Sequence, residues 1–207
     1  MFNSQAGQDR FILYVLNNKF NGFFVEIGSN HPIDINNTYV LENNYGWKGI
    51  MIEYDNNFLQ SYKNIRPNST HVINDATKIN YNELFRSVNA PKNIDYLQID
   101  LEVVNSSTID TLKLLNEQVF KEYKFAVITF EHDIYRGNFY NTREESRKIF
   151  KDNGYFMVYG DVQHTGNSFE DWYVHPDLVN MKYINKINSD EILEWNVIIE
   201  NIKNVIF

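Results

Sequence analysis

Short apolar runs alternate with helix-patterned segments along the whole chain, and this alternation limits the fold more than any other feature. The runs are short, apolar throughout rather than alternating, and bounded by turn residues, which is typical of strands buried on both faces of a parallel sheet. Strands are expected at residues 23–27, 48–53, 71–73, 94–100, 125–130, 155–159 and 169–174. We therefore predict an α/β fold of three layers: a doubly wound, mostly parallel, seven-stranded, Rossmann-like sheet.

The last part of the chain has a helical pattern over residues 190–202. Trp195, Ile198, Ile199 and Ile202 would share one face of this helix. We expect that face to cover the sheet or to contact a second subunit, so a homo-oligomer is one expectation. A chain of 207 residues can form one sizeable α/β domain, and we expect a single domain over residues 1–207.

Composition excludes several classes of function. The formal net charge is −8, which disfavours general binding to nucleic acid. The chain has no cysteine, which excludes thiolate nucleophiles and zinc–thiolate sites. It has no signal-peptide pattern and no apolar stretch near the roughly 18 residues that span a bilayer. We therefore expect a cytoplasmic protein with neither a nucleic acid nor a membrane as partner.

A polar or acidic side chain follows each of the first five expected strands. Parallel strands bring their carboxyl ends to one edge of the sheet, where doubly wound folds bind ligands. These strand-end residues are Glu26, Gly28, Ser29, Asn30, Glu53, Asp75, Asp100, Glu102, Glu131 and His132. Taken singly, each is most often a turn, a cap or a solvated group; their recurrence in order indicates a ligand site.

The residue types fit a nucleoside. Gly28 allows the backbone to approach a ligand closely. Glu53, at the end of the second strand, can accept both ribose hydroxyl hydrogens, and Asp75 can accept from an adenine amino group. The first loop lacks the three-glycine pyrophosphate fingerprint. S-adenosylmethionine contains no pyrophosphate, so it fits this loop better than NAD.

Several strings, in order along the chain, resemble the FkbM-type methyltransferase family over most of its length. The opening SQAGQD has Gln8 where the family usually has Glu, and the pair after the fifth strand is Glu131-His132. The matching strings are VEIGSN (25–30), NNTYVLE (36–42), GWKGIMIE (46–53), DYLQIDLE (95–102) and DWYVHP (171–176).

This resemblance implies a class I methyltransferase fold, an S-adenosylmethionine cofactor and O-methylation of a hydroxyl on a sugar or another small or glycan acceptor. The expected cofactor-binding residues are Glu26, Gly28, Ser29, Asn30, Asn37, Thr38, Glu53, Asp75 and Asp100. The chain departs from the family at Pro32, often glycine, and at Val103, where the family often continues Gly-x-Glu. These departures put the catalytic assignment in more doubt than the cofactor assignment.

Methyl transfer requires an acceptor oxygen held near the methyl group and a base that removes its proton. His132 is the first candidate base because histidine titrates near neutral pH, although it could equally be a structural histidine. Asp100 and Glu131 are the other expected catalytic residues. Asp161, His164, Asp171 and His175 could line the acceptor pocket, or lie in an ordinary surface turn.

Two other functions fit the same residues. Asp100, Glu102, Glu131 and His132 could bind a divalent metal, either to acidify the acceptor hydroxyl or in a metal-dependent hydrolase. We do not favour a metal, because many methyltransferases use none. The chain could also be a non-catalytic nucleoside-binding module on the same fold, as the departures at Pro32 and Val103 would permit.

Overall fold

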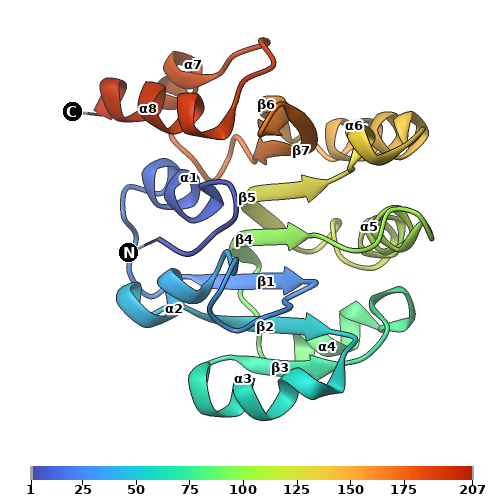
Figure 1. Cartoon of the computed structure of the whole chain (residues 1–207). Coiled ribbons are helices and arrows are strands. Elements are labelled where there is room, and N and C mark those ends of the chain that lie inside the picture. The colour runs from blue at the N-terminus through green and yellow to red at the C-terminus, as the bar shows by residue number, and fades with distance from the viewer. Residues whose placement is uncertain (1, 207) are drawn as a thin grey trace.

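Seven strands form one sheet in the computed structural model, which describes residues 2–206 (Figure 1). The strand order is β3-β2-β1-β4-β5-β7-β6. β1 to β5 are parallel, and β7 runs antiparallel to both of its neighbours, β5 and β6. The strands are β1 (Phe23–Ile27), β2 (Lys48–Glu53), β3 (Thr70–Ile73), β4 (Asn93–Ile99), β5 (Lys124–Glu131), β6 (Phe156–His164) and β7 (Asn167–Val174).

Helices cover both faces of this sheet, so the predicted three-layer, doubly wound architecture is confirmed. One face carries α1 (Gln8–Val15), α2 (Tyr39–Tyr45), α3 (Leu59–Ile65), α7 (Met181–Ile187) and α8 (Trp195–Ile206); the other carries α4 (Tyr81–Ser87), α5 (Ser107–Gln118) and α6 (Tyr140–Asp152). In Figure 1 these two groups lie left and right of the strands. Short 3₁₀ helices follow three strands: η1 (Asn56–Phe58), η2 (Ala76–Lys78) and η3 (Ile134–Arg136).

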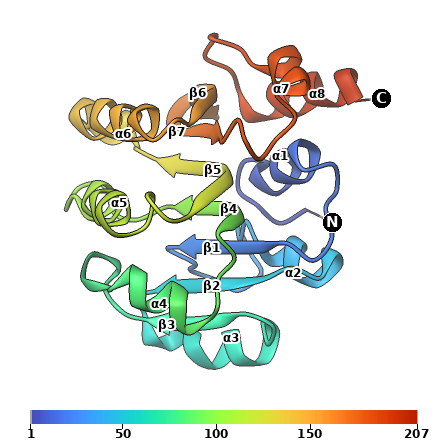
Figure 2. The same ribbon diagram turned by 180° about the vertical axis from the view of Figure 1, so that it is seen from behind.

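The C-terminal helix packs within its own chain. Ile198, Ile199 and Ile202 are fully or almost fully buried in the same cluster as the apolar side of α1. Both ribbon views show α8 beside α1 and α7 (Figure 2). The apolar face that we considered as an interface is thus used internally. α7 was not predicted. None of the helices in residues 2–206 has the length and apolar character needed to cross a membrane.

A buried arginine fixes the loop that follows β1. Arg66, directly after α3, is fully buried and donates to Glu42 at 2.8 Å, Thr38 Oγ1 at 2.7 Å and Asn36 Oδ1 at 3.0 Å. It also reaches the carbonyl oxygen of Pro32. The guanidinium group of Arg66 is buried and has four such partners. Movement of the loop would break some of these contacts and leave a buried charge without a partner, which costs free energy. The loop between β1 and α2 is therefore held in one conformation.

A buried carboxyl fastens α1 to the edge of the parallel part of the sheet. Glu170 on β7 accepts hydrogen bonds from Gln8 Nε2 and Trp172 Nε1, both at 2.7 Å. Burial raises the pKa of Glu170 to about 8, so at neutral pH this residue is mostly protonated. Its carbonyl oxygen can still accept both hydrogen bonds in that form.

This raised pKa predicts a pH-dependent stability. The folded state holds the Glu170 proton more tightly than the unfolded chain, whose carboxyl has a pKa of 4.5, so unfolding becomes easier as the pH rises from about 4.5 to about 8. We expect Glu170→Gln to remove this loss, which amounts to about 4 kcal/mol over this pH range. Thermal melts at both ends of the range would measure it. The surface variant Glu117→Gln is the control. If Glu170→Gln keeps the pH dependence of the parent, as Glu117→Gln should, the raised pKa of Glu170 is not its cause.

Candidate functional site

A crevice lies at the carboxyl ends of β1, β2, β4 and β5, where the sheet reverses its direction of winding. We call it the central crevice; its volume is about 600 Å³, within the range of ordinary ligand pockets. Of the nine expected cofactor-binding residues, seven line it: Glu26, Gly28, Ser29, Asn30, Asn37, Glu53 and Asp100. Glu131 and Gln5 line it as well.

Gly28 lines the crevice at the point where the loops after β1 and β4 meet. Its φ is +87°, and a Cβ added there would lie 1.8 Å from the carbonyl oxygen of Asp100. Only glycine can occupy this position, because the left-handed conformation and the contact with the β4 end both exclude a side chain. The loops after β1 and β4 thus meet backbone to backbone, and the crevice opens above this contact.

Glu26 presents an unpaired carboxylate oxygen toward this region. Its Oε2 accepts from Asn36 Nδ2 at 3.2 Å, whereas its Oε1 is buried and has no hydrogen-bond partner within residues 2–206. Burial raises the pKa of Glu26, an effect that the nearby Arg66 partly offsets. A buried acceptor without a partner costs free energy, so this oxygen is a natural contact for a ligand that carries an ammonium or another donor.

Glu53 is held by the backbone at the end of β2. It accepts from the N–H groups of Asn30 and Tyr54 at 2.8 Å and from that of Asp55 at 2.9 Å. These hydrogen bonds orient its carboxylate, and remaining lone pairs stay free to accept from a ligand's hydroxyl groups. The bond from Asn30 also ties the loops after β1 and β2 together.

Asp75 does not line the central crevice with the other expected cofactor-binding residues. It lines a neighbouring cavity of about 450 Å³, the side cavity, lined by Tyr54, Asp75, Ala76, Leu101, Glu102, Asn105 and Ser107. Its Oδ1 accepts from Thr77, and its Oδ2 pairs with Lys78. These contacts, that with Lys78 foremost, lower the pKa of Asp75 to about 2, so it remains ionised.

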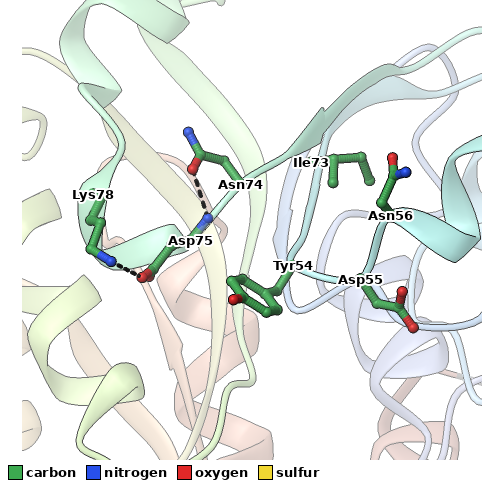
Figure 3. Close-up of a pocket in the computed structure, with 7 residues that line it drawn as sticks. All are labelled: Tyr54, Asp55, Asn56, Ile73, Asn74, Asp75 and Lys78. Carbon is green, nitrogen blue, oxygen red and sulfur yellow. Dashed lines mark hydrogen bonds and ion pairs between the residues drawn. The ribbon is translucent and has the colours of Figure 1, made fainter.

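Tyr54 connects the central crevice with the side cavity. This residue directly follows Glu53, lines both spaces and is 77% exposed. It also borders an open groove at the ends of β2 and β3, where its ring is directed toward Asp75 (Figure 3). An exposed aromatic ring at this junction can stack on a planar ligand that extends from one space into the other. Tyr54 was not predicted as a site residue, although its position directly after Glu53, at the end of β2, was a usable signal.

Thr38 is the second of the nine that does not line the crevice. Its side chain is fully buried, and its Oγ1 accepts from Arg66. It supports the loop around Asn37 instead. Asn37 itself lines the crevice and donates to Gln98 Oε1 at 2.8 Å. Thr38 is therefore a structural residue of the site and not a contact in it.

Asp100 and Glu131 form a carboxyl pair in the crevice, within hydrogen-bonding reach of each other. Burial raises the pKa of both; the nearby Asp100 charge then raises that of Glu131 further, well above the usual value. Neither forms a salt bridge with a cationic group in the described part of the chain. Such a pair holds one proton between two acids near neutral pH.

His132 does not reach the crevice, and the expectation that it is the base does not fit its position. It is fully buried, with Nε2 3.3 Å from Asp171 Oδ1 and 3.5 Å from Asp161 Oδ1. Arg147 contacts both of these carboxylates and Arg143 contacts Asp161, so two arginines neutralise the two acids. This group is an internal ion network under α6.

Of the four residues considered for a metal site, Asp100, Glu102 and Glu131 line the crevice, but His132 does not join them. Glu102 is half-exposed and lies 3.4 Å from Arg136 Nη1, while His132 faces the ion network. Within residues 2–206, the group whose geometry could hold a metal is His132, Asp161 and Asp171, and its carboxylates already pair with arginines. A cation there would have to displace those guanidinium groups, so the geometry does not favour a metal-dependent hydrolase.

A smaller cavity of about 160 Å³ adjoins the crevice at Gln5 and Glu131. We call it the hairpin cavity, because the turn between β6 and β7 closes one side of it. Its lining residues are Gln5, Glu131, Asp133, Tyr135, His164, Thr165, Asn167 and Phe169. Of the four residues expected in an acceptor pocket, His164 lies here; Asp161 and Asp171 belong to the ion network, and His175 lies near Lys124 at the opposite edge of the sheet.

The fold matches solved structures, although no family model and no curated protein sequence matches the chain. One similar structure is a TehB-like SAM-dependent methyltransferase from Corynebacterium glutamicum (TM-score 0.52, 13% identity, 84% of this chain and 89% of that one). Another is a candidate rRNA methylase from Clostridium thermocellum (0.55, 11%, 84% and 96%).

A third similar structure is a protein of the NADB-Rossmann superfamily from Streptococcus agalactiae, which matches this chain over its whole length (TM-score 0.51, 12% identity, 100% and 99% covered). At such low identity these similarities concern the fold alone. The chain has a Rossmann-like fold that it shares with class I methyltransferases of known structure.

Proposed function

We propose that the protein transfers a methyl group from S-adenosylmethionine to a hydroxyl group of a sugar or another small or glycan acceptor. The observation that carries this proposal is the convergence of Glu26, Gly28 and Glu53 on one crevice at the switch point of the sheet. The fold shared with methyltransferase structures supports the reaction, and the resemblance to the FkbM-type family supports the oxygen acceptor.

The residues present fit the cofactor group by group. The unpaired Oε1 of Glu26 would accept from the ammonium of the methionine part, and Glu53 from the ribose hydroxyls. The side cavity, with Tyr54 and Asp75, would take the adenine ring. Gly28 allows the loops after β1 and β4 to meet beside the cofactor, because a Cβ there would collide with the carbonyl oxygen of Asp100. No Gly-rich phosphate loop is needed, because the cofactor contains no phosphate.

The carboxyl pair provides the proton acceptor. When bound, S-adenosylmethionine supplies a methyl group on a positively charged sulfur, so the leaving group needs no further activation. The acceptor oxygen must lose its proton as it forms the new bond to carbon. Glu131 and Asp100 line the crevice and share one proton, so the ionised member of the pair can take up the second. His132 is not part of this proposal.

Cofactor binding tests the proposal directly. We expect S-adenosylhomocysteine to bind with a micromolar dissociation constant, about −8 kcal/mol, in calorimetry. Glu53→Gln removes a charge-assisted acceptor and should weaken binding about tenfold. Glu117→Gln, the same change on the exposed side of α5, should bind like the parent. The absence of heat with both the methylated and the demethylated compound would refute the proposal.

A pH–rate profile tests the carboxyl pair. Because the pair must lose a proton before it can act as a base, we expect activity to rise with pH, with an apparent pKa above the 4.5 of an ordinary glutamate. Glu131→Gln should lower kcat about a hundredfold and flatten this rise with pH, because the variant lacks the carboxyl group that must lose its proton.

Affinity for S-adenosylhomocysteine serves as the control for that variant and should change little. A Glu131→Gln enzyme with the parent's rate and the parent's profile would exclude the pair as the base. Binding of the cofactor without turnover of any hydroxyl acceptor would favour the non-catalytic nucleoside-binding function.

A further inference from the structure

The hairpin cavity is a separate compartment beside the reacting carboxyls. It shares Gln5 and Glu131 with the central crevice, so a molecule that occupies it has its neighbouring atoms at the carboxyl pair. Its volume of about 160 Å³ has room for about five water molecules. That space suits the end of an acceptor, a group the size of a small ring, and not a large polymer segment.

Asp133 gives this cavity an unused hydrogen-bond acceptor. The residue is 2% exposed, and its Oδ1 is buried without a hydrogen-bond donor in the part of the chain that the structure describes. Its Oδ2 accepts from Arg136 Nη1 at 2.9 Å. Glu131 lies beside Asp133 as well as Asp100, but the one proton that Glu131 carries cannot serve both neighbours. An acceptor oxygen buried in this way is costly unless a ligand pairs with it.

The charges around the cavity favour a neutral ligand. Arg136 neutralises Asp133 through the other carboxylate oxygen, and burial keeps Glu131 largely protonated, with a pKa well above its usual value. The remaining polar side chains are those of Gln5, Thr165 and Asn167, which are uncharged, and that of His164, whose imidazole carries a charge only when it is protonated. A cation would meet only the single negative charge that Asp100 and Glu131 share, and an anion would face the free oxygen of Asp133. Tyr135 and Phe169 add aromatic surface for a ring to pack against.

We infer that the hairpin cavity binds a neutral polyhydroxylated group of the acceptor and that Asp133 Oδ1 determines this specificity by accepting a hydroxyl hydrogen next to the methylated position. This inference rests on the proposed function, because it assigns the acceptor side of the same site. The cavity would thus select hydroxyl-bearing acceptors over their amino or carboxylate counterparts.

The variant Asp133→Asn tests the role of Oδ1 most directly. Its oxygen would stay on Arg136, so its NH₂ group would point into the cavity and replace an acceptor by a donor without a change in volume. Asp133 has a φ of +48°, a conformation that Asn adopts readily, so the variant should fold. Asp152→Asn, at the end of α6 that leads into β6, is the matched control.

The probes are methyl glucoside, glucosamine and glucuronate, which share one ring and differ in charge. Saturation-transfer NMR would be measured with and without S-adenosylhomocysteine, at a pH at which the amine is cationic. We expect methyl glucoside to bind most tightly and to lose at least about tenfold in affinity in Asp133→Asn but not in Asp152→Asn.

Equal binding of methyl glucoside by the parent and Asp133→Asn, tighter binding of either charged sugar, or no binding of the three would overturn the inference. Calorimetry with S-adenosylhomocysteine on the same samples separates this failure from failure of the proposed function. If S-adenosylhomocysteine binds but Asp133→Asn does not change the affinity for methyl glucoside, the inference alone is wrong. If S-adenosylhomocysteine does not bind, the proposed function is wrong.

Discussion

The backbone contact between Gly28 and Asp100 is the constraint on which the site depends. β1 and β4 are parallel neighbours, joined in register from Phe24 and Tyr96 to Ile27 and Ile99. Beyond this register the chain turns toward α2 on one face and toward α5 on the other, which opens a crevice at the switch point. The carbonyl oxygen of Asp100 occupies the space of a Cβ at Gly28, so the two loops meet as closely as backbones can. Any side chain there would push them apart and change the crevice that carries the other groups.

The placement of the arginines separates the buried acids that form ion pairs from the acids that line the crevice. Arg66 pairs with Glu42 beneath the loop after β1, and Arg147 pairs with Asp171 beneath α6. Those buried carboxylates are neutralised, and their ion pairs hold the scaffold. Asp100 and Glu131, only a few residues away in the sheet, form no salt bridge in the part of the chain described here, so proton sharing is their route to lower charge. Ion pairs on both faces of the sheet thus hold the surrounding structure, while the protonation of Asp100 and Glu131 can change.

Much of the fold could be predicted from the sequence because each strand is a short apolar run bounded by polar residues. β1 and β2 were predicted to the residue, and seven of the nine cofactor positions line one crevice, since parallel strands bring their ends to one edge. α7 was missed because its seven residues carry only a short apolar pattern. Thr38 does not line the crevice because its side-chain partner decides its role: its hydroxyl group accepts a hydrogen bond from the buried Arg66. Asp75 lines the side cavity, where Thr77 and Lys78 contact its carboxylate.

The position of His132 could have been predicted from the sequence, because side chains alternate between the two faces of a strand. Successive side chains of a strand point to opposite faces, so Glu131 and His132 cannot both reach one crevice at the end of β5. The antiparallel register pairs Glu131 with Glu170, whose side chain contacts Gln8 on the α1 side, and pairs Phe130 with Asp171, which lies under α6. His132 follows the parity of Phe130 and joins the α6 side. The adjacent acid and histidine therefore lie on opposite sides of the sheet, Glu131 in the crevice and His132 in the ion network under α6.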